Sequence, residues 1–451
     1  MWRIFQPLSA RWQGALALGR IVRRAIRGVL HSAATRLKAR GLIPPRRQPV
    51  QPPRIITMLV ADDRIDRRVL LQARSLVRAG MRVTVVASPH PAEEAQDLDA
   101  LAWPEIEILR IRPEMPTQTS FDATVTRLGA LGALADALFV HHAHFLEAAM
   151  MRPADLVVAH DLPVLATALT VADLTGARLH FDAHEIFAEQ RRLPVWRRII
   201  YRALERRLAP LADIVTTVNQ SIADEMARRN HIPRPGIILN VPDVTASRTE
   251  QRGRGLREKL GIGEQPQLIL FHGAFFGNRN LETLIEAMSY VRDPACMLVL
   301  MGPDGEEKQA LKGLAQSRHL LGRRVHFLPT VPQNELIALV ASADIGIIPY
   351  PGVDKNTIYC SPNKLFDFIV AGVPILANDL PELRRFVVDG GVGLVHAMTD
   401  ARAIAAGIDR IAADDKIAMR EAARRLAPQM CWSHEERAFL SLYGLSAAEV
   451  E

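Results

Sequence analysis

The sequence predicts an α/β protein with two doubly wound domains built on parallel sheets, and three observations support this. The chain has 451 residues, more than a single hydrophobic core usually holds, so two domains are expected. Short apolar runs alternate with amphipathic stretches in both halves, which is the βαβ rhythm of parallel sheets covered on both faces. A stretch rich in Gly, Pro, Arg and Thr at 240–263 interrupts that rhythm. We expect a cleft between the domains, with ligands at the carboxyl ends of the strands.

The predicted strands are short runs rich in Val, Ile and Leu. In the first half they are residues 55–60, 82–87, 156–159, 178–181 and 214–218. In the second half they are residues 268–272, 297–301, 325–328, 345–348 and 375–377. Helices are predicted between them, including 69–79 and 196–208. The expected organisation is an arm and linker at 1–53, domains at 54–245 and 246–428, and a final segment at 429–451.

The N-terminal segment is strongly basic. Residues 1–54 contain twelve Lys or Arg and no Asp or Glu, so the remainder must be net −5 if the whole chain is +7. Apolar residues of this arm recur at steps of three and four from Phe5 to Leu37, which places them on one helical face opposite the arginines. A basic helix with Trp and Phe on its apolar face is suited to an anionic membrane surface. We expect residues 1–40 to dock the protein there.

Other readings of the arm are an organelle transit peptide and a helix packed on its own domain. Nucleic-acid binding is not expected, because aromatic residues are few and no binding motif accompanies the arm. The sequence has no run of eighteen apolar residues that would span a bilayer. Three cysteines without paired or metal-like spacing fit a reducing compartment. The expected location is cytoplasmic, peripheral on the inner face of the cell membrane.

A polar loop, a short helix and a buried strand follow one another at residues 359–377. Ser361 is predicted as the helix N-cap and Pro362 as the first helical residue. The unpaired N–H groups of the first turn, with Lys364, are suited to a phosphate. Asp367, one turn later, is placed to accept hydrogen bonds from ribose hydroxyls. The alternative is an ordinary capped helix whose Lys and Asp are solvated.

A second anion-binding loop is predicted after the strand at 268–272. Gly273 opens a strand-to-helix loop that continues to Asn280, and glycine lets the backbone approach an anion closely. Arg279 in this loop offers a guanidinium fork suited to diphosphate. One such loop is a weak signal, whereas two in one domain favour a nucleoside diphosphate.

The chain resembles the retaining glycosyltransferases of family 4, also called group 1, which have the GT-B fold. The resemblance covers residues 54–445 and is carried by 273–282, Gly302-Pro303, 343–350, 361–374 and 381–383. It implies that the C-terminal domain binds a nucleotide sugar, that the N-terminal domain binds the acceptor, and that residues 432–443 form a final helix returning to the first domain.

The resemblance assigns donor-binding roles residue by residue. Arg279 matches the family's basic residue against the diphosphate, Asn363 and Lys364 match its phosphate-binding helix start, and Asp367 matches the second of its paired glutamates. Two departures are Tyr359 at the first glutamate position and Ala274 at the first basic position after Gly273. The set expected on the donor side is Gly273, Arg279, Tyr359, Ser361, Asn363, Lys364 and Asp367.

Polar residues at two adjacent strand ends in the first half resemble the family's acceptor and sugar side. The run Asp182-Ala183-His184-Glu185 matches its Asp-x-His-Glu motif, in which the His contacts the transferred sugar, and His160-Asp161 matches a similar pair. A hydrogen-bonded structural histidine is the alternative. The loop after the first strand carries Asp62, Asp63 and Arg64 in place of the family's Gly-Gly loop, which resembles the Asp-x-Arg-Val version of some members.

No metal site or bound cofactor is expected. His141, His142, His144 and Glu147 lie in a helical pattern and are interpreted as a solvated helix face. The resemblance implies metal-independent transfer of a sugar from a nucleoside diphosphate sugar to a glycan or lipid-linked acceptor, with retention at the anomeric carbon. His184, Arg279 and Lys364 are the expected catalytic residues. Two alternatives are a GT-B nucleotide-sugar epimerase and a non-catalytic GT-B subunit at the membrane.

Overall fold

The computed structural model describes residues 52–89, 100, 102–112, 142–191, 193–244, 255–414 and 416–445. The predicted amphipathic arm lies outside the described residues, as does His141. Within the described part of the chain no helix combines the length and apolar character needed to cross a bilayer.

The chain folds into two compact units, and it passes between them more than once. The first unit contains Met1–Val218, Ile222–Ile238 and Glu436–Glu451, and the second contains Asn219–Ser221 and Leu239–Glu435. The final helix α19 (Trp432–Ser441) therefore begins in the second unit and ends in the first. The C-terminal segment thus contributes to both units.

The first unit is a seven-stranded parallel sheet with the order β3-β2-β1-β4-β5-β6-β7. Its strands are β1 (Ile55–Val60), β2 (Arg82–Ala87), β3 (Glu107–Arg110), β4 (Leu156–His160), β5 (Arg178–Ala183), β6 (Ile214–Thr217) and β7 (Gly236–Ile237). Its helices are α2 (Arg67–Arg78), α6 (His142–Met150), α7 (Leu162–Thr175), α8 (Val195–Leu208) and α9 (Gln220–Asn230), with short turns η1 (Phe187–Glu189) and η2 (Ala209–Leu211).

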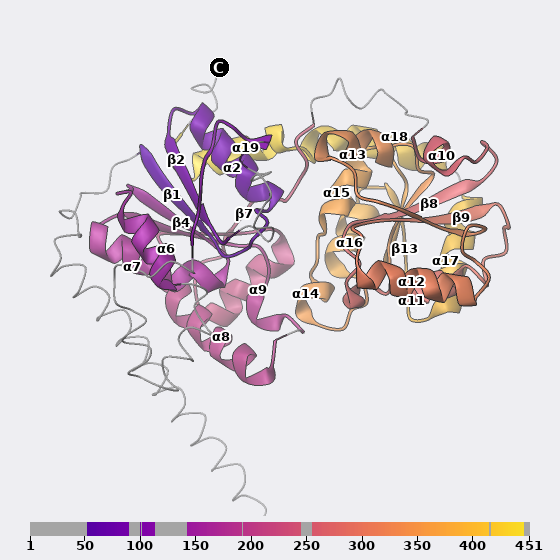
Figure 1. Cartoon of the computed structure of the whole chain (residues 1–451), viewed down its shortest axis with the longest axis horizontal. Helices are drawn as coiled ribbons and strands as arrows, with labels where there is room; N and C mark the ends of the chain where they lie inside the picture. Colours follow the sequence, from indigo (N-terminus) through magenta and orange to yellow (C-terminus); the bar gives the residue numbers. More distant parts are fainter. Residues whose placement is uncertain are drawn as a thin grey trace, which may run out of the picture. The chain divides into compact units, whose positions relative to one another are not determined.

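Strand order reverses between β1 and β4, and this decides where the helices lie. From β1 the chain continues to β2 on one side of the sheet, whereas from β4 it continues to β5 on the other side. Because such crossovers are right-handed, α2 and α7 cover opposite faces of the sheet, as Figure 1 shows. Ligands of doubly wound sheets bind at the carboxyl ends of the strands beside such a reversal.

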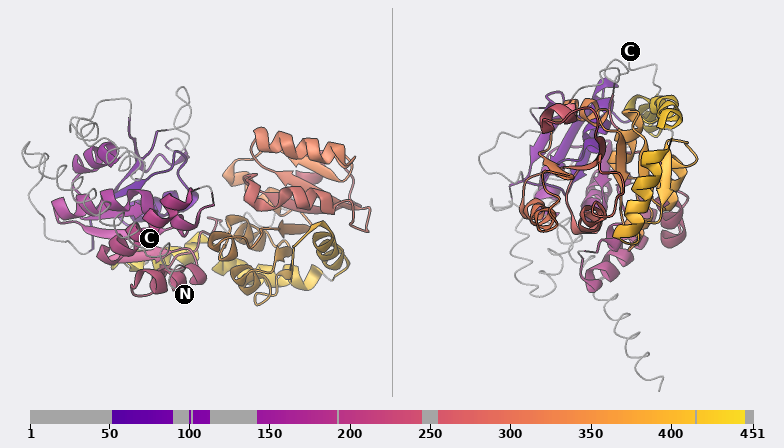
Figure 2. Two further views of the ribbon diagram at one scale, coloured as in Figure 1. Left: turned by 90° about the horizontal axis from the view of Figure 1, so that it is seen from below. Right: turned by 90° about the vertical axis from the view of Figure 1, so that its right-hand side faces the viewer.

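The second unit repeats the plan with six parallel strands in the order β10-β9-β8-β11-β12-β13. The strands are β8 (Gln267–His272), β9 (Cys296–Met301), β10 (Val325–Leu328), β11 (Ile345–Ile348), β12 (Ile375–Asn378) and β13 (Gly393–His396). Helices cover both faces of the sheet (Figures 1 and 2). They are α10 (Gly255–Leu260), α11 (Leu281–Ala287), α12 (Glu306–Ser317), α13 (Gln333–Val340), α14 (Lys355–Ile358), α15 (Asn363–Val370), α16 (Pro381–Val387), α17 (Ala401–Ala413) and α18 (Lys416–Leu426), with turns η4 (Gly277–Arg279) and η5 (Ala427–Gln429).

The predicted strands all form, most of them within one residue of the expected bounds. Three strands were not predicted, namely β3, β7 and β13. β3 and β13 are edge strands whose side chains are only partly buried, and β7 has two residues beginning at Gly236. Edge strands lack the continuous apolar run of strands buried on both faces, so the sequence signal for them is weak.

Candidate active site

Two glycines bring the backbone at the end of β8 close to its neighbours. Gly273 has φ +114°, a conformation that side chains rarely adopt, and a Cβ there would lie 3.6 Å from Nζ of Lys364. At the end of β9, a Cβ on Gly302 would lie 2.5 Å from the carbonyl oxygen of Gly273. The loop is therefore built by close backbone approach beside a buried lysine.

Arg279 ends the η4 turn of this loop and is half-buried. Its guanidinium carbon lies 4.2 Å from the ring centroid of Tyr350, which follows β11, and 5.8 Å from that of Phe276. No carboxylate of the described residues forms an ion pair with it. Because β8 and β11 are the strands on either side of the order reversal, Arg279 lies where a doubly wound sheet binds its ligand.

Lys364 lies in the first turn of α15 and is 5% exposed. Nζ donates a hydrogen bond of 2.6 Å to the hydroxyl of Tyr350 and lies 3.9 Å from the ring centroid of Phe271. Burial, and then the nearby positive charge of Arg279, hold the pKa of Lys364 well below its usual range. A bound anion at this point would restore the charged form.

Asp367 is buried one turn after Lys364, and its Oδ2 lies 3.8 Å from Nε2 of His272 at the end of β8. Gly273, Arg279, Lys364 and Asp367 thus come together in the second unit. Tyr350 joins the two cations but was not predicted from the sequence. Its position directly after a predicted strand beside the order reversal is the signal that would have found it.

The predicted N-cap is wrong. Helix α15 begins at Asn363 with Pro362 as N-cap, and no side chain caps it. The hydroxyl of Ser361 instead accepts a hydrogen bond of 2.9 Å from Nδ2 of Asn219, which also donates to the carbonyl oxygen of Tyr359. Proline at the N-cap position leaves the first turn without a side-chain acceptor, so its N–H groups are free of a competing cap.

In the first unit, Asp182 of β5 is fully buried and binds Arg68 of α2. Nε and Nη2 of Arg68 donate to the two carboxylate oxygens at 2.9 and 2.6 Å, and Nε2 of Gln72 donates to Oδ2 at 3.0 Å. Thr216 of β6 donates to Oδ1 at 2.6 Å. Burial raises the pKa of Asp182, but the charge and hydrogen bonds of Arg68 outweigh it and hold the pKa well below its usual range. Asp182 is therefore an ionised residue of the interior of the first unit.

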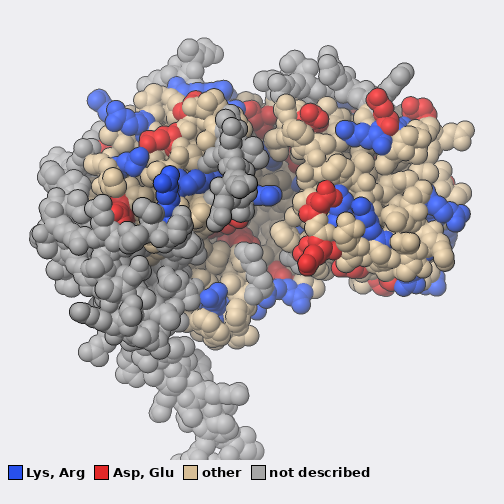
Figure 3. Space-filling view, in the orientation of Figure 1, with Lys and Arg blue, Asp and Glu red and all other residues tan. Residues whose placement is uncertain are grey.

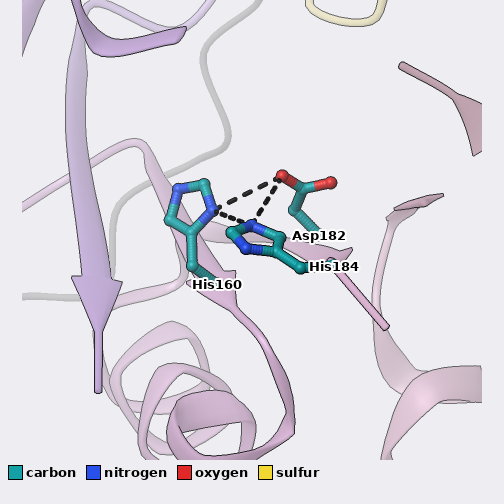
Figure 4. Close-up of side chains that lie close together, drawn as sticks. All are labelled: His160, Asp182 and His184. Carbon is teal, nitrogen blue, oxygen red and sulfur yellow. Dashed lines mark hydrogen bonds and ion pairs between the residues drawn. The ribbon is translucent and has the colours of Figure 1, made fainter. Parts of the chain in front are cut away.

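Two histidine side chains meet Asp182 at the carboxyl ends of β4 and β5 (Figure 4). Nδ1 of His160 and Nε2 of His184 are 3.2 Å apart, and each lies 3.4 Å from Oδ2 of Asp182. Asp161 accepts a hydrogen bond of 2.8 Å from the backbone N–H of His184, and its Oδ2 lies 3.7 Å from Nδ1 of the ring. The predicted pairs His160-Asp161 and Asp182-His184 therefore form one cluster.

The pKa values of the two histidines of this cluster are shifted in opposite directions. Burial lowers the pKa of His184, but Asp161 and Asp182 outweigh it and raise that pKa to about 9. Burial lowers the pKa of His160, against a smaller opposing effect of Asp182. Burial raises the pKa of Asp161 to about 7. At neutral pH the cluster therefore presents a protonated His184 beside a neutral His160.

Among the described residues, His160, Asp182 and His184 offer ligand atoms within 4.8 Å of one another, a spacing that a metal ion could bridge. Oδ2 of Asp182 already accepts hydrogen bonds from Arg68 and Gln72. A buried guanidinium beside the carboxylate also repels a divalent cation. The arrangement favours a hydrogen-bonded network over a metal centre.

The other predicted residues of the first unit lie near this cluster in the chain but make separate contacts. Asp62, Asp63 and Arg64 are exposed after β1, and the backbone carbonyl of Asp63 accepts a hydrogen bond of 2.6 Å from Arg110. Glu185 accepts a hydrogen bond from Gln190. The expectation of a solvated histidine face on α6 is wrong for His142, which is buried with Nδ1 2.6 Å from the hydroxyl of Thr167.

Comparisons with known proteins identify the fold. The HepE protein of Anabaena, solved in complex with UDP, superposes with a TM-score of 0.63 at 16% identity, covering 86% of this chain and 100% of that one. Two doubly wound parallel units of this kind define the GT-B class of glycosyltransferases, as the sequence predicted. A model of the group 1 glycosyl transferases matches residues 254–429, and a model of the glycosyl transferase 4-like domain matches residues 65–240. The chain belongs to this family of glycosyltransferases.

Curated relatives agree with this assignment. A D-inositol 3-phosphate glycosyltransferase of Corynebacterium urealyticum is 25% identical over 260 residues, which cover 54% of this chain and 59% of the relative. A GDP-mannose-dependent phosphatidylinositol monomannoside mannosyltransferase of Mycolicibacterium smegmatis is 27% identical over 233 residues, covering 48% of this chain and 57% of the relative. The chain thus spans about three fifths of the length of these curated relatives.

Proposed function

We propose that this chain moves a sugar from a nucleoside diphosphate sugar to a glycan or lipid-linked acceptor at the membrane, with retention at the anomeric carbon. The observation that carries the proposal is the pairing of Arg279 and Lys364 through Tyr350. The positive charge of Arg279 lowers the pKa of Lys364, and a bound anion would stabilise the charged forms of both side chains. A diphosphate has the charge and the oxygen geometry to bind both.

The donor side of the mechanism is electrostatic. Negative charge develops on the diphosphate as its bond to the anomeric carbon breaks, and Arg279, Lys364 and the N-terminus of α15 stabilise that charge. The cations are fixed in place beforehand, so little reorganisation is needed during the reaction. We propose that these two side chains do the work of a metal ion and that transfer is metal-independent.

The sugar and acceptor side is assigned to the His184 cluster in the first unit. A protonated His184, held between Asp161 and Asp182, donates hydrogen bonds to a sugar hydroxyl or to the carboxylates around it. We propose that the departing phosphate oxygen removes the acceptor proton on the same face of the sugar, so that no protein nucleophile is required. The fixed position of Asp182, bound by Arg68, keeps the cluster in one geometry.

The acceptor and its location are proposed from the N-terminal arm and from the relatives. Twelve basic and no acidic residues in the first 54 suit an anionic inner leaflet, where each adds about 1 kcal/mol of attraction. The mycobacterial relative is named for a phosphatidylinositol mannoside acceptor, a membrane lipid. A lipid-linked acceptor on the cytoplasmic face is consistent with that relative and with the arm.

Titration calorimetry with UDP, GDP and ADP, followed by transfer of radiolabelled sugar to a membrane extract, tests the proposal. Arg279→Ala and Lys364→Ala should each lower transfer about a hundredfold or more, on the order of 3 kcal/mol in the transition state. Lys312→Ala, at a half-buried lysine of α12 whose Nζ lies 6.0 Å from the ring centroid of Phe327, is the matched control and should leave transfer unchanged. Near-normal transfer by the Arg279→Ala/Lys364→Ala protein would contradict the role of these residues in diphosphate binding. Nucleotide binding without sugar transfer by the unmodified protein would favour a non-catalytic subunit.

A further inference from the structure

Helix α8 carries an exposed apolar patch on the first unit. Five large hydrophobic side chains of that unit are exposed within the described ranges, and four of them lie on α8 or on the adjoining turn η2. Their exposed fractions are 70% for Val195, 44% for Trp196, 50% for Ile199 and 57% for Leu211. Scattered exposed side chains need no explanation, but a cluster on one element marks an interaction surface.

The exposed patch is not the side of α8 that packs on the core of the unit, because that side is already buried. Ile200, Tyr201, Leu204 and Leu208 are buried against the unit. Val195, Trp196 and Ile199 fall within one helical turn on the opposite side, and Arg202, Arg206 and Arg207 continue the same side toward Leu211. We call this set of seven exposed residues the α8 face.

The α8 face and its surroundings are strongly basic. Residues 191–211 contain seven Arg and one acidic residue, Glu205, which is buried. Arg202 is paired with Glu189 and Arg206 with His231, whereas Arg207 has no acidic partner within the described part of the chain. Lys and Arg side chains are visible over the end of the unit formed by α8 and α9 in Figure 3.

We infer that the α8 face docks the first unit on an anionic lipid bilayer. A tryptophan and aliphatic side chains beside arginines are the composition of a helix that lies in a membrane interface, with the apolar groups in the acyl boundary and the charges at the headgroups. The basic arm of the same chain is an unsuitable occupant, because its twelve positive and no negative charges repel the arginines of the α8 face. An acidic protein partner is the competing occupant, and the experiment below separates it.

The α8 face is connected to the His184 cluster by the turn that follows β5. The ring of Phe187 packs edge-on against Tyr201 of α8 with centroids 5.1 Å apart. Arg198 of α8 donates to the carbonyl oxygen of Ala188 and to Glu189 at 2.8 Å. Docking of α8 would therefore fix the segment after His184, which suits a lipid-linked acceptor. That link to the acceptor rests on the proposed function, whereas the docking itself does not.

Trp196 is a built-in probe of this contact. In a full-length protein with Trp2→Phe and Trp12→Phe, the arm contributes no tryptophan fluorescence. Vesicles of phosphatidylcholine and phosphatidylglycerol that carry brominated acyl chains should quench this protein, and a further Trp196→Phe change should remove the quenching. Quenching that persists after Trp196→Phe would overturn the inference. So would a lack of quenching in the protein that retains Trp196, if that protein sediments with the vesicles. Neither readout depends on sugar transfer, so a failure of the proposed function would be seen separately.

Variants of the α8 face test affinity in the otherwise unmodified chain. Trp196→Ser/Ile199→Ser and Arg206→Glu/Arg207→Glu should each lower the vesicle partition coefficient about tenfold or more. Ile417→Ser and Arg410→Glu, exposed positions of the second unit, are the matched controls and should leave it unchanged. Equal partitioning of all four proteins would contradict bilayer docking. Self-association that both α8 variants abolish, with vesicle binding intact, would assign the face to a protein contact instead.

Discussion

The ring of Tyr350 contacts two basic side chains from different elements: the guanidinium carbon of Arg279 in turn η4 is 4.2 Å from its centroid, and Nζ of Lys364 in helix α15 donates to its hydroxyl at 2.6 Å. Burial raises the pKa of Tyr350 to about 12, so the hydroxyl stays neutral and accepts from Nζ of Lys364. A single side chain therefore sets the spacing of the two cations that we propose bind the diphosphate.

Tyr350 variants should separate its two contacts. Tyr350→Phe keeps the stacking on Arg279 and loses the hydrogen bond to Lys364, so the Kd for UDP or the preferred nucleotide should rise about tenfold. Tyr350→Ala also loses the cation–π contact and should weaken binding by a further factor of about ten. Calorimetric titration measures both. Tyr290→Phe, a surface tyrosine beneath Arg402, is the matched control. Wild-type affinity in both Tyr350 variants would show that the ring does not position the cations.

Lys364 should take up a proton when a diphosphate binds. Burial and Arg279 hold its pKa below the usual range in the free protein, and a bound diphosphate raises that pKa again. Diphosphate binding is therefore coupled to protonation of Lys364. The affinity for the diphosphate should fall as the pH rises above the pKa that Lys364 has in the free protein. Titration in buffers of different ionisation enthalpy at pH about 8 should reveal uptake of up to about one proton, because the nucleotide phosphates are already ionised there. Lys364→Gln should abolish this uptake and Lys312→Gln should not.

His184 should stabilise the fold more at low pH than at high pH. Its pKa in the folded protein, about 9, lies above the unfolded value of 6.5. The stabilisation is thus fully present below pH 6.5 and is lost as the pH rises through about 9. The loss of unfolding free energy caused by His184→Gln should therefore be larger at pH 6 than at pH 9.5 in urea denaturation. The exposed His434→Gln is the control, and an equal loss for His184→Gln at the two pH values would contradict the prediction.

Arg68 should be essential to the folded first unit. Arg68→Met leaves the carboxylate of Asp182 buried without its cation, a change that costs about 3–5 kcal/mol of unfolding free energy. A second change, Asp182→Leu, removes the uncompensated charge and should restore part of that loss. Arg318→Met, which breaks the exposed pair with Glu286, should cost about 0–1 kcal/mol. A loss in Arg68→Met no larger than in Arg318→Met would refute a buried, ionised Asp182.

The sequence specified the buried strands well because runs such as Leu268–Phe271 are apolar on both faces, and parallel strands covered by helices require this. It could also place Arg279 and His184 near strand ends and Lys364 in the first turn of a helix. It could not show that Asp182 binds Arg68, because the two residues are 114 positions apart and no local pattern links α2 to β5. The Ser361 cap failed for a related reason: a distant residue, Asn219, takes the hydroxyl. Local patterns predict elements, whereas partners of polar side chains depend on tertiary contacts.

A chain of hydrogen bonds connects the C-terminal segment to the His184 cluster, and its direction is fixed. The ionised carboxylate of Asp182 can only accept, so the hydroxyl of Thr216 donates to it. That hydroxyl then accepts from Nε2–H of His180, 2.7 Å away, and Nδ1 of His180 accepts from the hydroxyl of Tyr443, also 2.7 Å away. Burial lowers the pKa of His180 to about 3, which agrees with a neutral ring that donates at one nitrogen and accepts at the other.

The hydroxyl of Tyr443 is the last donor in this series of hydrogen bonds. Its removal leaves Nδ1 of His180, a buried acceptor, without a donor. Tyr443→Phe should therefore lower the unfolding free energy by about 1–3 kcal/mol, whereas the exposed Tyr290→Phe should change it by less than about 0.5 kcal/mol. If the chain also positions Asp182, the pH dependence of kcat should shift in Tyr443→Phe while the KM for the donor stays unchanged. His180→Phe/Tyr443→Phe removes both ends of that hydrogen bond and should cost less than the sum of the single changes. Full additivity of the two changes would show that His180 and Tyr443 are not coupled.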